Sequence, residues 1–100
     1  MAPHDCYGGT HRLLTHRAKQ KRLRVLFIDQ NDDDAVDRAL SQNPAMIIIE
    51  TPSNPLMRLV DVAALAARAK AAGALVMCDN TFLSPARMLP LSLGLSLIHI

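Results

Sequence analysis

The sequence predicts an α/β fold built on a parallel sheet. Three short apolar runs, residues 24–28, 46–49 and 74–78, have the composition of buried strands. Between them lie two segments, beginning near residues 32 and 60, whose apolar residues recur at helical spacing. Strands that alternate with helices of this length are typical of right-handed βαβ crossovers, so we expect the three strands to lie parallel in one sheet.

The chain before these crossovers is predicted to be less regular. Residues 1–10 contain a proline and a Gly-Gly pair and are expected to form a loop. A weak helical pattern follows from Thr10 to Gln20. Three aspartates, Asp32 to Asp34, open the first crossover helix, where the positive end of the helix dipole favours carboxylates. We prefer this explanation of the aspartates to a metal site, because no other ligands lie near them in the sequence.

Polar residues follow two of the predicted strands directly. Glu50 ends the run 46–49, and the next residues, 51–55, include two prolines that stop the strand. Asp79 ends the run 74–78, and an amide and a threonine follow it. The carboxyl ends of parallel strands meet at one edge of a sheet, and ligands bind there. We therefore expect these side chains to surround one crevice.

No general sequence motif indicates which chemistry takes place in this crevice. A dinucleotide-binding G-x-G-x-x-G is absent after the first predicted strand, and neither a P-loop nor a G-x-S-x-G elbow occurs. The residues alone therefore leave two classes of function open. One is an enzyme with a polar pocket. The other is a non-catalytic, receiver-like α/β module that uses Asp29 or Asp79 as an acidic site.

Charge and composition narrow the range of partners and compartments. The net charge is +2, and six of the eleven basic residues lie within residues 12–24. No aromatic residue is interleaved among them, so we interpret them as a solvated helix face, and nucleic-acid binding is the less favoured alternative. Cys6 and Cys78 lack metal-site spacing and are expected to be free thiols in a reducing compartment. Because no signal-peptide pattern or membrane-length apolar run occurs, we expect a cytoplasmic protein without membrane contact.

Three motifs resemble those of a known family. They are residues 4–10 (HDCYGGT), 50–55 (ETPSNP) and 79–85 (DNTFLSP), and the resemblance runs in order through roughly residues 3–94. They look like the Cys/Met-metabolism family of pyridoxal-phosphate (PLP) enzymes, which includes cystathionine γ-synthases, cystathionine lyases, methionine γ-lyases and homoserine sulfhydrylases. Within the family, residues 3–14 and 24–30 look closest to the bacterial cystathionine γ-synthases. The resemblance implies an aspartate-aminotransferase-like fold, whose large domain has three layers around a parallel sheet.

The resemblance also implies roles for individual residues. Asp79 would pair with the protonated pyridine nitrogen of PLP, which keeps the ring an electron sink. Tyr7 would stack on the cofactor ring and take part in proton transfer at the substrate. Asn54 would bind the 3′ oxygen of the cofactor, and Thr81 would shape the pocket. Glu50 would orient the Asn54 turn or contact the site, without a catalytic role, and no metal is implied.

Parts of the family pattern are missing from this sequence. The lysine that holds PLP lies in a Ser-x-Thr-Lys segment, whereas Lys19, Lys21 and Lys70 here stand in helical patterns. The phosphate-binding segment and the small C-terminal domain have no counterpart either. We therefore expect residues 1–94 to be an internal fragment of the large PLP-binding domain. Residues 95–100 depart from the family pattern and are interpreted either as a divergent strand or as a sequence-junction artefact.

The resemblance implies a parent enzyme that works by γ-replacement. It would join an O-acylated homoserine, such as O-succinylhomoserine, to cysteine and form cystathionine in methionine biosynthesis. Its partners would be small amino-acid substrates and further copies of itself in a homotetramer. Cystathionine or methionine γ-lyase and O-acylhomoserine sulfhydrylase activities stay open within the family. Without its lysine, the fragment itself is expected to be inactive.

Overall fold

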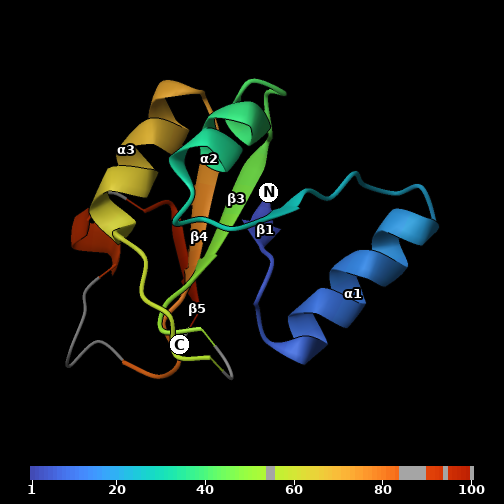
Figure 1. Ribbon diagram of the computed structural model, residues 1–100, viewed down its shortest axis with the longest axis horizontal. Helices are drawn as coiled ribbons and strands as arrows, with labels where there is room; N and C mark the ends of the chain where they lie inside the picture. Colours follow the sequence, from blue (N-terminus) through green and yellow to red (C-terminus); the bar gives the residue numbers. More distant parts are fainter. Residues whose placement is uncertain (54–55, 84–89, 94, 100) are drawn as a thin grey trace.

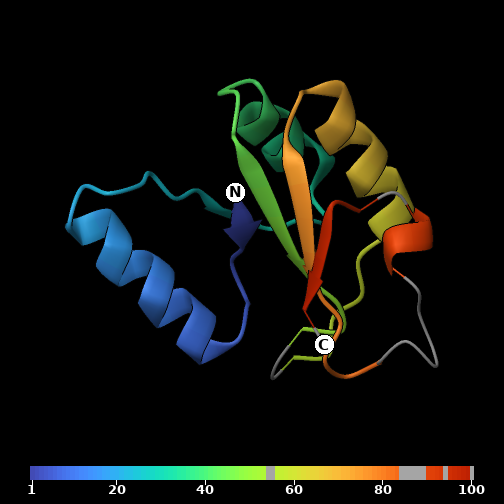
Figure 2. The same ribbon diagram turned by 180° about the vertical axis from the view of Figure 1, so that it is seen from behind.

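A parallel sheet forms the centre of the molecule, and two helices cover one of its faces (Figures 1 and 2). This computed structural model describes residues 1–53, 56–83, 90–93 and 95–99. Strands β3 (Met46–Glu50), β4 (Leu75–Asp79) and β5 (Leu97–His99) pair in parallel in that order. Helices α2 (Asp33–Leu40) and α3 (Val62–Ala71) precede β3 and β4. The predicted α/β architecture is confirmed.

The N-terminal segment forms a separate two-stranded sheet, so the expectation that residues 24–28 lie in one sheet with the other two predicted strands is wrong. Residues 2–3 were expected in a loop but form β1 (Ala2–Pro3), which pairs in parallel with β2 (Phe27–Ile28). The predicted strand 24–28 is reduced to these last two residues. Met1 links β1 to β3, because its amino group donates to Met46 O (3.0 Å) and its carbonyl accepts from Ile48 N (2.9 Å). This alternation is the hydrogen-bond pattern of parallel strands.

The core lies between the sheet and helices α2 and α3. Side chains alternate along a strand, so every second residue of β3 and β4 points to the helices. These residues are fully buried: Ile47, Ile49, Val76 and Cys78. The helices contribute small or branched side chains, namely Val36, Ala39, Val62, Leu65, Ala66 and Ala69. Ala66 and Ala69 are the small side chains that α3 buries against the sheet.

Side-chain caps account for the starts of both covering helices. Asp32 caps α2 by accepting from Asp34 N (3.0 Å) and Ala35 N (3.3 Å). Asp61 caps α3 by accepting from Ala64 N (3.0 Å). The helix-start explanation of the aspartates is therefore confirmed. In the described part of the chain, no group of three or more His, Cys, Asp or Glu residues is arranged to hold a metal ion.

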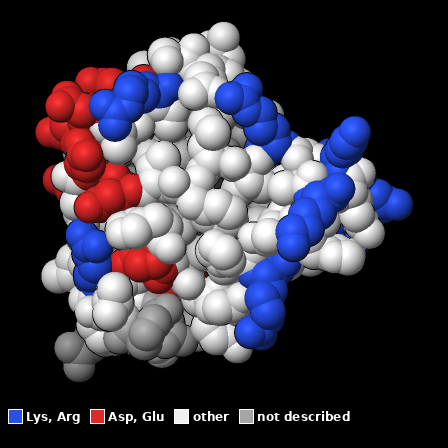
Figure 3. Space-filling view, turned by 45° about the vertical axis from the view of Figure 1, so that its right-hand side comes forward, with Lys and Arg blue, Asp and Glu red and all other residues white. Residues whose placement is uncertain are grey.

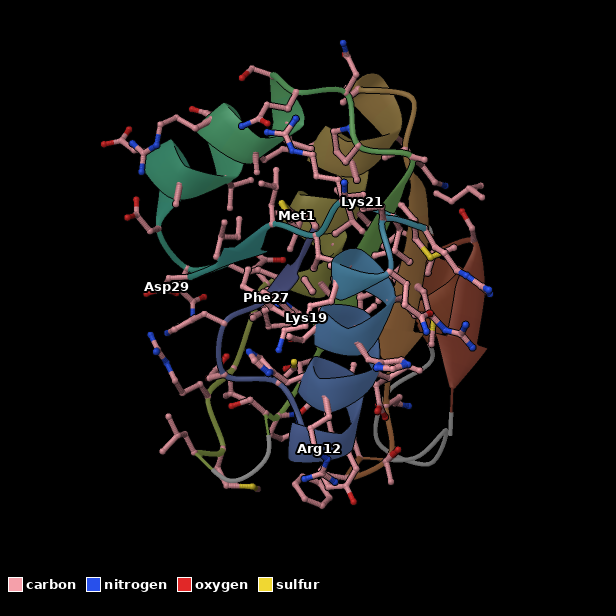
Figure 4. The ribbon with its side chains drawn as sticks, turned by 90° about the vertical axis from the view of Figure 1, so that its right-hand side faces the viewer. Met1, Arg12, Lys19, Lys21, Phe27 and Asp29 are labelled. Atoms are coloured by element: carbon pink, nitrogen blue, oxygen red, sulfur yellow. The ribbon has the colours of Figure 1, made fainter. Side chains whose placement is uncertain are left out.

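Helix α1 (Gly8–Lys19) stands to one side of the sheet and has no buried residue (Figures 1 and 4). It contacts β2 through a stack of the His11 and Phe27 rings, whose centroids are 4.4 Å apart. An apolar hollow of about 220 Å³ lies between α1 and the sheet. The helix begins at Gly8, two residues before the predicted start at Thr10, and Tyr7 is its N-cap.

Charge is separated along the molecule. Residues 8–28 contain six Lys or Arg and no Asp or Glu, whereas the rest of the chain has five basic and nine acidic residues. Figure 3 shows most of the blue atoms on the side of α1 and the red atoms on the opposite side. Ion pairs between Arg68 and both Asp33 and Asp37 belong to the acidic side.

The described helices and the end of the chain bear on two further expectations, namely the absence of membrane contact and the structure of residues 95–100. None of the helices in the described ranges is long and apolar enough to cross a membrane. Residues 97–99 form β5 next to β4, so a strand does form within the segment 95–100. The assignment of residues 1–94 and 95–100 to separate parts of the chain stays a prediction.

Candidate active site at the carboxyl edge of the sheet

Glu50 and Asp79 lie next to each other at the edge of the sheet that is formed by the carboxyl ends of its strands. They are the last residues of β3 and β4 and are direct partners in the parallel ladder. The chain just beyond Glu50 stays at this edge, because Thr51 N donates to Asp79 O (3.4 Å). The predicted meeting of the two polar strand ends is therefore confirmed.

Thr81 holds one oxygen of the Asp79 carboxylate. Both Thr81 N (3.1 Å) and the Thr81 hydroxyl donate to Asp79 Oδ1. Within the described ranges, the other oxygen, Oδ2, makes no hydrogen bond. The half-buried carboxylate thus has a fixed direction and one acceptor left for a ligand. Thr81 therefore fixes the direction of the Asp79 carboxylate, and its role in shaping a pocket stays a prediction.

Tyr7 reaches the same edge from the N-terminal segment. Its backbone N–H donates to both oxygens of Glu50, at 2.9 Å to Oε2 and 3.2 Å to Oε1. Tyr7 is 52% exposed, and its ring lies against Gly9, where a Cβ atom would be only 2.8 Å from Tyr7 Cε1. Figure 1 shows the start of α1 at the same end of the molecule as the segments that follow β3 and β4.

A polar cluster joins the segment before Tyr7 to the turn after β3. Ser53 Oγ donates to Asp5 Oδ2 (2.9 Å) and accepts from Arg58 N (3.1 Å). The Arg58 guanidinium also pairs with Asp29 Oδ2 (3.3 Å). Sequence reasoning missed this cluster, because its members come from between positions 5 and 58 and form no local pattern. Asn54, which follows Ser53 in the sequence, lies outside the described residues.

Burial keeps the two cysteine thiols protonated near neutral pH. It raises the pKa of Cys78 to about 11, and the adjacent Asp79 carboxylate adds to this shift. Burial likewise raises the pKa of Cys6, with a further contribution from the Glu50 charge. Both residues are buried, free cysteines, as the sequence predicted. A protonated thiol is a poor nucleophile, so neither cysteine is suited to covalent catalysis.

The whole described chain fits one sequence family. Residues 1–99 match the profile of the family described as Cys/Met metabolism PLP-dependent enzyme. The chain belongs to this family. PLP is therefore the cofactor of the complete enzyme, and the parallel sheet is part of the large domain of such an enzyme.

Individual relatives agree with this assignment. Cystathionine γ-synthase of Escherichia coli (strain K12) is 50% identical over 98 residues, which cover 98% of this chain and 25% of that protein. Cystathionine γ-lyase of Bacillus subtilis (strain 168) is 38% identical over 94 residues, which cover 94% of this chain and 25% of that protein. The chain thus spans about a quarter of the length of these curated relatives.

A solved structure gives the same result for the fold. It is the cystathionine γ-synthase of Xanthomonas oryzae pv. oryzae in complex with aminoacrylate and cysteine. The TM-score is 0.95 at 43% sequence identity, over 97% of this chain and 25% of that one.

The described side chains fit a pyridinium cofactor. A pyridinium nitrogen needs an anionic acceptor, and Asp79 offers a carboxylate with one oxygen open and the other held by Thr81. A flat ring needs an aromatic face, and half of the Tyr7 surface is exposed at the same edge. The charge and the flat surface that such a cofactor requires are both present.

Replacing Gly9 by alanine should displace the Tyr7 ring, because the new Cβ would collide with Cε1. The chain has one tyrosine and no tryptophan, so its intrinsic fluorescence reports on Tyr7 alone. We expect altered emission and altered quenching by iodide in Gly9→Ala. Gly8→Ala is the matched control, since its Cβ would meet only Arg12 Nη1, at 3.7 Å. Unchanged fluorescence in Gly9→Ala would contradict this ring position.

The raised pKa of Cys78 should make stability fall at high pH. The unfolded chain releases this proton near the ordinary pKa of 9.0, and the folded chain only near 11. The stabilisation is complete below pH 9 and is lost as the pH rises towards 11. Across this window we expect the free energy of unfolding to fall by about 2–3 kcal/mol more in the unmodified chain than in Cys78→Ala. Urea unfolding measures this difference, and parallel pH curves would refute it.

Proposed function

We propose that this chain is part of a PLP-dependent γ-replacement enzyme. The enzyme would form cystathionine from cysteine and an O-acylated homoserine, with O-succinylhomoserine as the preferred substrate. The observation that carries this proposal is the 50% identity to the cystathionine γ-synthase of E. coli, against 38% for the γ-lyase of B. subtilis. The TM-scores support it, at 0.95 for the X. oryzae synthase and 0.86 for the γ-lyase CalE6 of Micromonospora echinospora.

The residues at the sheet edge would divide the work in the complete enzyme. Asp79 would accept a hydrogen bond from the pyridine nitrogen, and Thr81 would keep the carboxylate turned towards it. Tyr7 would cover the ring face and move a proton at the substrate through its hydroxyl. Asn54 would bind the 3′ oxygen. When bound, PLP supplies an electron sink, which makes removal of a proton next to the amino group feasible.

Related activities are the alternatives within the family. A γ-lyase would release the group at the γ-carbon without replacing it, and an O-acylhomoserine sulfhydrylase would accept an inorganic sulfur donor. The sulfhydrylase has support from a B. subtilis relative named cystathionine γ-synthase/O-acetylhomoserine (thiol)-lyase, which is 36% identical to this chain. The receiver-like module is set aside, because the family match covers residues 1–99.

The active form would need more than these 100 residues. The three lysines lie at the end of α1, in the turn after it and on α3, and none stands in the family's lysine motif. We propose that this chain by itself does not hold PLP covalently and is inactive. The complete enzyme would be a cytoplasmic homotetramer that binds small amino-acid substrates. Light scattering on the chimera described below would measure its oligomeric state.

A chimera can test the proposed activity. In it, the 98 aligned residues of E. coli cystathionine γ-synthase are replaced by those of this chain. We expect it to form cystathionine from O-succinylhomoserine and cysteine. Asp79→Asn should lower kcat at least about a hundredfold, as expected for loss of electrostatic stabilisation. Asp34→Asn, an exposed change on α2, is the control. A chimera that binds PLP but only eliminates succinate, even with cysteine present, would favour the lyase.

Borohydride reduction can test the proposed inactivity of the isolated chain. Residues 1–100 are mixed with PLP, reduced and digested, and the lysines are examined by mass spectrometry. We expect no stoichiometric adduct at any one lysine, because all three lie outside the site. A unique, stoichiometric PLP adduct at Lys19, Lys21 or Lys70 would show that the chain holds the cofactor itself.

A further inference from the structure

We propose that Glu50 is the positioning residue that sets where the Tyr7 ring stands at the site, an inference that rests on the function proposed above. Glu50 is only 5% exposed and ends β3. Its two carboxylate oxygens lie 2.9 and 3.2 Å from the backbone nitrogen of Tyr7. The contact joins residues 43 positions apart and connects the sheet edge to the start of α1.

A buried carboxylate at this position is costly unless it is hydrogen-bonded. Its ladder partner is Asp79, and like charges side by side on neighbouring strands repel each other. The Tyr7 N–H offsets part of this cost. It lies at the positive end of the dipole of α1, where a negative charge is favoured. The hydrogen bond to the Tyr7 N–H therefore gives a structural reason for a glutamate at position 50.

Tyr7 depends on this contact, because its own helix supplies little else. Tyr7 is the N-cap of α1, but no side chain caps the helix, and α1 has no buried residue. Glu50, which comes from another element of the fold, accepts from the N–H of Tyr7 itself, the same N–H that the glutamate of a capping box binds. The Asp5–Ser53 hydrogen bond holds the chain two residues earlier. With the backbone fixed at both points, the direction in which the Tyr7 side chain leaves it is determined.

Glu50→Gln is the sharpest variant, because it keeps the size of the side chain and one acceptor oxygen. In the 100-residue chain, we expect a lower fluorescence anisotropy of Tyr7 in this variant, with circular dichroism unchanged. Asp34→Asn is the matched control, since it also removes one carboxylate, but from an exposed residue of α2. Unchanged anisotropy in Glu50→Gln would overturn the proposal.

The chimera adds a second measurement, its kcat, which should not change if Glu50 has a purely structural role. Misplacement of a group at a reacting centre costs up to about a hundredfold in rate, so we expect kcat to fall about ten- to a hundredfold in Glu50→Gln. The PLP content should stay the same. In a Tyr7→Phe background, Glu50→Gln should cost clearly less, because residues that act together are not additive. Additive losses, or loss of PLP, would contradict positioning through Tyr7.

Failure of this inference can be told apart from failure of the proposed function. A chimera without synthase activity would count against the function, whereas Tyr7 anisotropy in the 100-residue chain would still decide the role of Glu50. If Glu50→Gln does not fold, hydrogen exchange of the unmodified chain provides the measurement. We expect the Tyr7 amide to exchange at least about tenfold more slowly than an unfolded chain, and exchange at the unfolded rate would overturn the contact.

Discussion

The parallel ladder between β3 and β4 is the constraint on which the site depends. It pairs Glu50 with Asp79 and, on the opposite face, sets Ile49 beside Cys78 against the helices. Because side chains alternate along a strand, a slip of one residue would exchange the two faces. The charged groups would then face α3, and the apolar side chains that now pack on the helices would point to the opposite face of the sheet. The same strand register therefore determines both the burial of the aliphatic face and the alignment of the two acids.

The second requirement is that a distant part of the chain reaches this edge. Met1 joins β1 to β3 through main-chain hydrogen bonds, Asp5 binds Ser53, and the Tyr7 N–H binds Glu50. These contacts follow one another along seven residues, so the N-terminal segment is attached to the end of the sheet at several points. The backbone of Tyr7 is thereby attached to an acid at the end of β3. Such convergence of separate segments on rigid strands is what a cofactor site needs.

The sequence could predict those features that depend on local pattern. The apolar runs of β3 and β4, the caps Asp32 and Asp61 and the polar strand ends all follow from composition and spacing within about ten residues. β1 could not be predicted, because two residues form a strand only when a partner is already in place. The start of α1 was misplaced for a related reason. Tyr7 has no capping side chain, and the acceptor for its N–H comes from a residue 43 positions away.

The separation of charge has a consequence for the behaviour of the molecule in solution. With basic residues gathered around α1 and acidic residues around α2, the molecule carries a permanent electric dipole moment. Its weak net charge of +2 therefore understates the field that a neighbour experiences. At low ionic strength this field orients approaching molecules so that unlike ends meet. At about 0.1 M salt its range shrinks to about 10 Å, so that orientation acts only near contact.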